Sequence, residues 1–166
     1  LEVGSPGFAE ESVEGNNAYA GAEGSYLQLP SDGLLSEEFS TTFWYKVNAD
    51  PDRAGIIVIG PEDEENPDAQ NNRTSGFRLF REGSADEQRI KANVGNGSAD
   101  SWNDGGVIDV AAGEWVHVAF VITDSESHIY LDGELVNTGD VPGGVDWTGT
   151  DIVSIMSGAP RFTGWN

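Results

Sequence analysis

Apolar and polar residues alternate along short segments of this chain, a pattern of period two that predicts β-strands. Glycine, proline and asparagine separate these segments, and no stretch has the period and length of a convincing helix. Strands are predicted at residues 25–30, 39–47, 55–60, 76–81, 88–94, 115–122, 128–131 and 151–156. Residues 1–24, 61–70, 95–106, 141–149 and 157–166 are predicted as irregular segments or loops. Short strands with frequent turns are typical of an all-β antiparallel sandwich.

The predicted strand at residues 39–47 carries bulky side chains on both faces. Every second residue from Phe39 to Val47 lies on one face, and Trp44 lies on the other. We therefore expect a central strand that is covered on both sides, with Trp44 in the core.

Residues 76–81 and 88–94 alternate as well. If these two strands pair as a meander, one face of their sheet carries Arg78, Lys91 and Asn93 toward solvent.

The clearest signal is a hairpin in residues 113–136. An apolar strand begins at Trp115, a first turn covers residues 123–127, and a second turn falls at Asp132-Gly133. An Asp-Gly pair between alternating apolar residues favours a type I′ turn, because both central positions of that turn need positive φ.

This hairpin, together with residues 24–30 (GSYLQLP) and 39–47 (FSTTFWYKV), resembles the laminin-G-like, concanavalin A-type jelly rolls. The resemblance implies two curved antiparallel sheets in a single domain over residues 1–166, with ligands on the concave face or at the loops of one rim. Members are mostly sugar-binding and adhesion modules, and this chain is most similar to those in secreted or surface proteins of marine, polysaccharide-degrading bacteria. The family's last strand follows a Phe-Thr-Gly-Trp type segment. The chain stops at Asn166, so either it is a truncated or processed piece or another segment supplies that strand, and an unpaired edge would invite association.

Length and composition restrict the class of protein. The 166 residues are enough for one domain with a sizeable core. The absence of cysteine excludes disulfides, thiolate metal sites and cysteine nucleophiles. No run of about 18 apolar residues occurs, so we expect no membrane insertion. The N-terminus has no signal-peptide pattern, which leaves open a mature chain or a module of a larger protein with other domains as neighbours.

The net charge is −21. One explanation is a solvated acidic surface that favours solubility, and the other is binding of divalent cations, which prefer carboxylate oxygens. Nucleic acids and anionic membranes are excluded as expected partners, because both need a basic face.

Most of the basic residues lie close together in the sequence. Arg73, Arg78, Arg81, Arg89 and Lys91 are five of the eight. Arginine matches the geometry of carboxylate and sulfate groups, so the cluster suggests a polysaccharide ligand that is anionic, such as a uronic-acid or sulfated algal glycan. The alternative is that these side chains only neutralise nearby acids.

Catalytic patterns are weak. Glycosidases of this fold use paired carboxylates on one strand, and the corresponding Glu-x-Asp-x-x-Glu motif is absent. The acidic runs Glu10-Glu11 and 62–65 lie in predicted loops, where no alternation aims them together. His117 and His128 are interpreted as packing or surface residues. We therefore expect neither hydrolase nor lyase activity.

Sugar binding fits the sequence better, because it needs an aromatic platform beside planar polar groups. Trp102 and Trp165 lie in predicted loops and are the expected stacking residues, Trp115 is assigned to the core, and Trp147 stays undecided. The predicted ligand site consists of Asn72, Arg73, Arg78, Asn93, Asn96, Trp102, Asp104, Arg161 and Trp165. The alternative for each asparagine is turn chemistry.

Calcium is the one cofactor that the resemblance suggests, because members of the family often carry it near the N-terminal segment. Glu14, Asn16, Asn17 and Glu23 offer oxygen ligands there, although their spacing matches no tight motif.

The sequence therefore predicts a non-catalytic carbohydrate-binding module of a secreted or cell-surface bacterial protein. The alternative is a structural or adhesion domain that binds protein partners or neighbouring domains. A lyase or hydrolase with an unfamiliar site is the third hypothesis.

Overall fold

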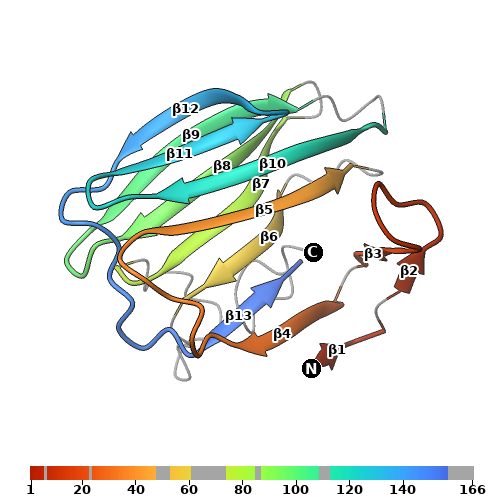
Figure 1. The fold of residues 1–166 in the computed structure, drawn as a ribbon, viewed down its shortest axis with the longest axis horizontal. Helices are drawn as coiled ribbons and strands as arrows, with labels where there is room; N and C mark the ends of the chain where they lie inside the picture. Colours follow the sequence, from red (N-terminus) through yellow and green to blue (C-terminus); the bar gives the residue numbers. More distant parts are fainter. Residues whose placement is uncertain are drawn as a thin grey trace.

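Antiparallel strands make up the regular structure of this protein. The computed structural model describes residues 1–5, 7–22, 24–47, 53–60, 74–84, 87–108 and 113–156. No helix long and apolar enough to span a membrane occurs in these ranges. Their strands are β1 (Glu2–Val3), β2 (Gly7–Ala9), β3 (Ala18–Ala20), β4 (Tyr26–Pro30), β5 (Phe39–Lys46), β6 (Arg53–Ile59), β7 (Phe77–Ser84), β8 (Glu87–Gly95), β9 (Asp100–Ile108), β10 (Trp115–Ile122), β11 (Glu126–Leu131), β12 (Glu134–Asp140) and β13 (Ile152–Ile155) (Figure 1).

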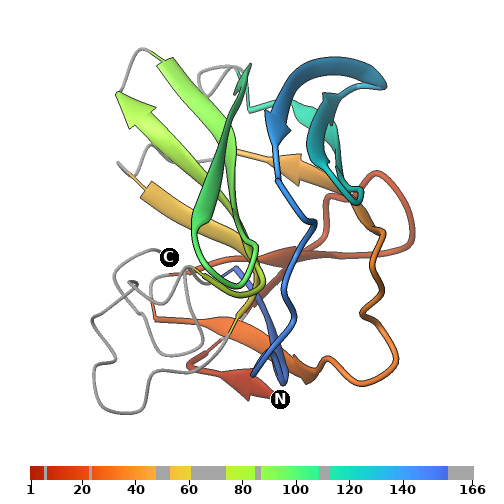
Figure 2. The ribbon, with the colours of Figure 1, turned by 90° about the vertical axis from the view of Figure 1, so that its left-hand side faces the viewer.

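The strands form two main sheets that pack face to face. The large sheet has the order β1-β4-β13-β6-β7-β8-β9, and the small sheet has the order β12-β11-β10-β5. A separate hairpin pairs β2 with β3. Figure 2 shows the two layers from the side, with β6, β7 and β8 on the left and β10, β11 and β12 on the right. The predicted fold, an all-β antiparallel sandwich, is confirmed.

The core fills the space between the sheets. Alternate residues of the central strands meet there, among them Phe77 and Leu79 from β7 and Val118 and Phe120 from β10, all fully buried. Full burial of one such side chain contributes about 1.5–3 kcal/mol, so this apolar layer holds the two sheets together.

The Asp132-Gly133 hairpin forms as predicted. Both residues have positive φ, 51° and 84°, as a type I′ turn requires. The Asp132 carboxylate also accepts a hydrogen bond from the backbone N–H of His117, with Oδ1 2.9 Å from the nitrogen. The turn is therefore fixed by backbone geometry and by one side chain.

Two segments differ from the prediction. Residues 95–106, predicted as a loop, contribute most of β9, and residues 1–24, predicted as irregular, contain β1, β2 and β3. The glycines of β9 serve a β-bulge, in which two residues, Asp104 and Gly105, lie opposite Lys91 alone. Gly105 has φ +63°, which suits the bulge. In the sequence alone, a glycine at a bulge cannot be told from a glycine in a loop, and this is why the strand was predicted as a loop.

The prediction of a central β5 with a buried Trp44 is wrong. β5 is the edge of the small sheet, and Trp44 is 42% exposed. The alternation itself is correct, since Phe43 and Tyr45 pack toward the core. Trp44 instead packs on the ring of His117 of β10, with the ring centroids 5.2 Å apart.

Candidate functional site

One row of side chains crosses the large sheet on its outer face, which is the face that points away from the small sheet. The strand registers align these residues from β4 to β9. The row consists of Gln28, Ser154, Val58, Arg78, Asn93 and Trp102. We call it the outer row. It brings together Arg78, Asn93 and Trp102, three residues of the predicted ligand site.

Trp102 is the exposed end of the outer row. It lies on β9, the edge strand of the large sheet, and is 40% exposed. The ring of buried Phe80 from β7 stands nearly perpendicular to the indole, at 88° and 6.0 Å between centroids. The indole is therefore held against the sheet by a second aromatic residue while part of its surface stays in contact with solvent.

Asn93 connects the row to the neighbouring strand. It is fully buried, and its Nδ2 donates to Asp100 Oδ2 at 3.0 Å and more weakly to the carbonyl oxygen of Ser101 at 3.4 Å. Its Oδ1 accepts no hydrogen bond, and the same is true of Oγ of Ser154, which is also fully buried. A buried polar atom without a partner costs about 1–3 kcal/mol, so a buried water molecule that bonds these two oxygens would stabilise the sheet.

Arg78 and Asn93 are both buried, so the prediction that they point toward solvent is wrong. Both lie on the predicted face and the predicted meander pairing is correct. The guanidinium lies over the sheet beside Gly60, where an added Cβ would be 3.3 Å from its Nη2. The aliphatic stem can be buried in this way because glycine leaves space for the charged end.

Lys91 and Asp104 lie next to the outer row. Nζ of Lys91 is 3.2 Å from Asp104 Oδ1 and 3.6 Å from Glu82 Oε2. The β9 bulge brings Asp104 opposite Lys91, and its side chain remains mostly exposed. The ammonium group is thus shared between two carboxylates.

The other described cations of the sequence cluster are separated from one another. Nε of Arg89 donates to Glu87 Oε1 at 2.8 Å. Arg81 is buried on the core side of β7, near Tyr45. Burial raises the pKa of the Tyr45 hydroxyl, and the charge of Arg81 opposes that rise. The described part of the cluster therefore does not form one basic patch.

Asn96 has a turn function in the structure. Its Oδ1 accepts from the backbone N–H of Ser98 at 3.1 Å and of Ala99 at 2.9 Å, and its Nδ2 donates to the carbonyl of Pro142 at 2.9 Å. These bonds order the β8–β9 connection and attach it to the loop after β12.

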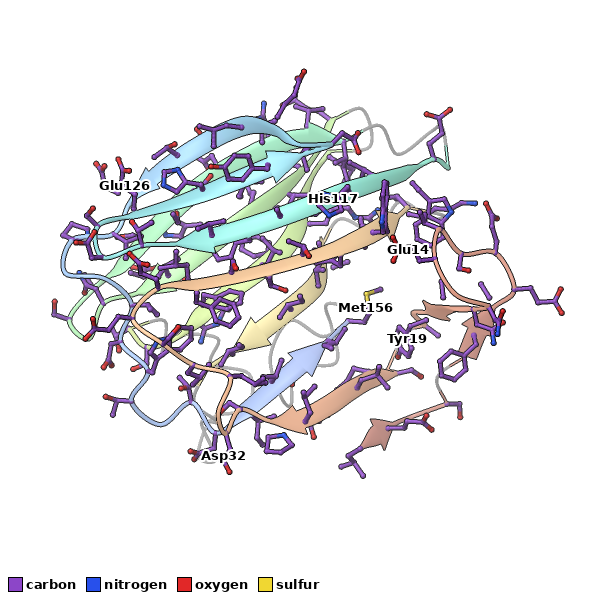
Figure 3. All side chains as sticks on the ribbon, viewed as in Figure 1. Glu14, Tyr19, Asp32, His117, Glu126 and Met156 are labelled. Atoms are coloured by element: carbon purple, nitrogen blue, oxygen red, sulfur yellow. The ribbon has the colours of Figure 1, made fainter. Side chains whose placement is uncertain are left out.

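Four predicted ligand-site residues, Asn72, Arg73, Arg161 and Trp165, lie outside the described residues. The same holds for Glu23 of the predicted calcium site. Glu14, Asn16 and Asn17 are exposed in the connection between β2 and β3, where Figure 3 labels Glu14. Across the described ranges no three carboxylate or imidazole side chains cluster as a metal site. The calcium site therefore stays a prediction.

The residues considered for catalysis are far less organised. Glu11 is exposed and ion-paired with Lys46, 2.8 Å away, which lowers the pKa of its carboxyl group. Residues 62–65 lie outside the described ranges. His117 and Glu126, both labelled in Figure 3, belong to the small sheet, and His128 lies 3.5 Å from Glu126 and 3.2 Å from Thr138. Both histidines are half-buried, which agrees with the interpretation as packing or surface residues.

Sequence reasoning missed Phe80, Ser154 and Asp100 as neighbours of the site. The alternation of residues 76–81 already placed Phe80 on the same face as Arg78. Nothing in the sequence indicates that Ser154, far along the chain, aligns with that face, because this depends on the pairing of β13 with β6.

Comparisons with known proteins agree on the fold. The sequence profile of the concanavalin A-like lectin/glucanases superfamily matches residues 21–166. No curated protein sequence matches the chain.

Three solved structures are similar in fold. Domain 4 of AbnA, a GH43 extracellular arabinanase from Geobacillus stearothermophilus, in complex with arabinotriose, has a TM-score of 0.62 and 20% identity, covering 97% of this chain and 71% of that one. Domains LG4-5 of the mouse laminin alpha1 chain give 0.54 and 12%, covering 81% and 32%. The binding domain of botulinum neurotoxin DC in complex with SialylT gives 0.58 and 13%, covering 94% and 38%. The chain thus spans about a third of the laminin and toxin chains.

Proposed function

The chain belongs to the concanavalin A-like lectin/glucanases superfamily, and we propose that it is a non-catalytic module that binds a polysaccharide at the Trp102 end of the outer row. The observation that carries the proposal is Trp102, an exposed indole that is braced by Phe80 and continuous with the polar groups of the outer row. An indole offers an apolar surface to the C–H face of a sugar ring, while the polar groups beside it satisfy hydroxyls.

The polar part of the row supports the same ligand class. Sugar hydroxyls both donate and accept hydrogen bonds. The buried oxygens of Asn93 and Ser154 lack hydrogen-bond partners, and a water molecule could connect them to a sugar hydroxyl bound beside Trp102. The exposed carboxylate of Asp104 adds an acceptor at the same edge.

The charge distribution favours recognition of hydroxyls over recognition of acidic sugars. Lys91 is shared between Glu82 and Asp104, Arg89 is bound to Glu87, and Arg81 points to the core. An anionic glycan, such as a uronic-acid or sulfated algal one, would have to compete with these carboxylates for the cations, so anionic glycans are tested separately from neutral ones.

Related folds give independent support. The arabinanase domain was solved with arabinotriose and the toxin domain with SialylT. The arabinanase is extracellular. By analogy, the proposal places this module outside the cell or on its surface, beside other domains of a larger bacterial protein.

Affinity electrophoresis in gels that contain laminarin, arabinan, agar, alginate, carrageenan or pectin tests this function. We expect one glycan to retard the protein, and Trp102→Ala to weaken the binding by about tenfold or more. The matched control is Trp44→Ala, because Trp44 has almost the same exposure but lies on the small sheet. Retardation that survives Trp102→Ala, or its absence with every glycan, would contradict the proposal.

Two further measurements test the remaining parts of the proposal. Release of reducing ends from the bound glycan would show that the module is an enzyme. The predicted calcium site is tested by repeating the gels and a thermal melt with calcium and with EDTA. Because a metal that binds the native state raises Tm, a calcium site should give a higher Tm with calcium than with EDTA.

A further inference from the structure

Trp102 is one of several exposed side chains that follow β9 along the outer face of the large sheet. In chain order they offer a carboxylate, the indole, a second carboxylate and an aliphatic group. We call these side chains the β9 line, which consists of Asp100, Trp102, Asp104 and Val107. The residues between them are buried or half-buried, so β9 presents one continuous line to solvent.

Val107 is the member of the line that the proposed function does not use. It is 52% exposed, and its register partner is Arg89, which lies on the same face of β8 as Lys91. The neighbouring Gly106 faces the other way, since an added Cβ there would be 2.5 Å from a side chain of β12. One exposed valine is ordinary on a protein surface. Val107 differs because it shares the strand and the face of Trp102, where it offers an apolar contact to a second sugar ring.

The strand that carries the line is fixed on its core side. Asn103 donates to the Ser127 carbonyl at 3.0 Å and accepts from Asn137 at 2.9 Å, which attaches β9 to β11 and β12 (Figure 1). On the outer side, Asp104 is held by Lys91. A ligand that lies along β9 therefore meets side chains on a strand that is already ordered, and little conformational entropy is lost on binding.

The two apolar members of the line lie too far apart for one sugar. Trp102 pairs with Asn93 and Val107 pairs with Arg89. At about 3.3 Å for each residue of β8, the two positions are separated by about 13 Å along the strand. This distance exceeds a single sugar ring and suits a short run of linked sugars.

We propose that the β9 line binds an internal run of neutral sugars in a linear polysaccharide, with one ring on Trp102 and a later ring against Val107. The inference rests on the proposed function and adds the direction, the length and the charge of the ligand. A ring on Trp102 has members of the line on both sides of it, as suits a sugar inside a chain rather than a sugar at its end.

Charge selects neutral sugars. The carboxylates of Asp100 and Asp104 lie on the two sides of Trp102. Lys91 is shared between Asp104 and a second carboxylate, and Asp100 accepts its hydrogen bond from the neutral amide of Asn93. A uronic acid or a sulfated sugar beside the indole meets like charge, whereas neutral hydroxyls donate to the same oxygens.

The first test is the dependence of affinity on chain length. Calorimetric titration uses the intact protein with laminarin-, arabinan- and agar-derived oligosaccharides, from the disaccharide to the hexasaccharide. In the series that binds, affinity should rise by about tenfold or more between the disaccharide and the hexasaccharide, because only the longer ligand reaches Val107. Equal affinity for all lengths would overturn the inference, as would binding to alginate, carrageenan or pectin alone.

A variant locates the far end of the ligand. Val107→Asp places a carboxylate where the second ring should pack, so it should weaken the hexasaccharide by about tenfold and leave the disaccharide within about twofold. The matched control is Leu135→Asp, at a side chain of nearly equal exposure on β12 of the small sheet, which should leave both lengths unchanged. The ratio of the two affinities in one protein sample does not depend on how much of that sample is folded.

The two proposals fail separately. Trp102→Ala should weaken both lengths and tests the proposed function. If Trp102→Ala has this effect while Val107→Asp weakens neither length, or weakens both equally, the module still binds glycans at Trp102 and the extended line is refuted.

Discussion

Trp102 and Trp44 have nearly equal exposure, 40% and 42%, and lie on opposite outer surfaces of the sandwich. Trp102 lies in one row with a buried asparagine and a buried arginine, near a shared lysine, and the oxygen of the asparagine side chain has no hydrogen-bond partner. Trp44 packs on His117 and lies on β5, the edge strand of the small sheet within the described residues, where the core-facing side chains are half-buried.

The comparison shows that an exposed tryptophan does not by itself define a binding site. Side-chain polarity around Trp102 suits a ligand that is covered with hydroxyls. Trp44 instead packs against the imidazole ring of His117. The surroundings of each indole therefore decide which chemistry its apolar surface serves.

The largest effect is expected from Gly105→Ala, which should disrupt the region of Trp102. An added Cβ would lie 1.4 Å from the carbonyl oxygen of Ile90, and φ is +63°. We expect a loss of at least about 3 kcal/mol in unfolding free energy, together with loss of glycan binding. In Gly133→Ala, φ is +84° but the space is open, so the cost should stay near about 1–2 kcal/mol. Urea denaturation measures both, and equal costs would refute the role assigned to the bulge.

Asn103→Ala should come next. Asn103 is buried on the core side of β9, where its Nδ2 donates to the Ser127 carbonyl at 3.0 Å and its Oδ1 accepts from Asn137 at 2.9 Å. Removal of the side chain leaves these partners unsatisfied and should cost about 2–3 kcal/mol. Thr42→Ala, at the exposed position beside Trp44, should change stability by less than about 0.5 kcal/mol. A small effect of Asn103→Ala in chemical denaturation would show that β9 is held without it.

Lys91→Met sharpens the assignment of the outer row to hydroxyls. The change removes a cation held between two carboxylates and should cost about 1 kcal/mol or less in stability. Binding of a neutral glycan, measured by affinity electrophoresis, should change by less than about twofold. A much larger loss would indicate that Lys91 binds an acidic sugar directly.

The smallest effects are expected at two carboxylates: Asp146 in the loop after β12, and Glu11, which pairs with Lys46 at the end of β5. Hydrogen bonds from Thr148 and Ser75 lower the pKa of Asp146 below its usual 3.8, and Asp146 anchors the loop after β12 to the ends of β7 and β8. Because the pKa is lower in the folded state, this stabilisation is complete above about pH 4 and is lost as the pH falls through the folded pKa.

The difference in Tm between the protein and Asp146→Asn should therefore shrink with acidification. Glu11 has a lowered pKa for the same kind of reason, a hydrogen bond and the charge of Lys46. Its ion pair is exposed, so Glu11→Gln should have the smaller effect, and salt should abolish it. An Asp146→Asn difference that is constant down to acidic pH would contradict the role of ionisation.

Local patterns predicted much of this structure. The alternation of residues 76–81 and 88–94 assigned Arg78, Lys91 and Asn93 to one face, and Asp132-Gly133 fixed the turn of the hairpin. The same reasoning failed for β9, because glycine in a bulge has the same appearance as glycine in a loop. It also failed for Trp44, because alternation specifies which face a side chain occupies and leaves open what covers that face.

By itself, the sequence determined the fold class, the strand faces, the hairpin turn and the excess of acidic charge. These depend on neighbouring residues, since side chains alternate with period two and turns need particular φ values. Only the tertiary structure decided that Ser154 lies in one row with Arg78, Asn93 and Trp102, that Arg81 points to the core, and that β5 is an edge. Those facts follow from strand order and register, which are set by packing between segments that lie far apart in the chain.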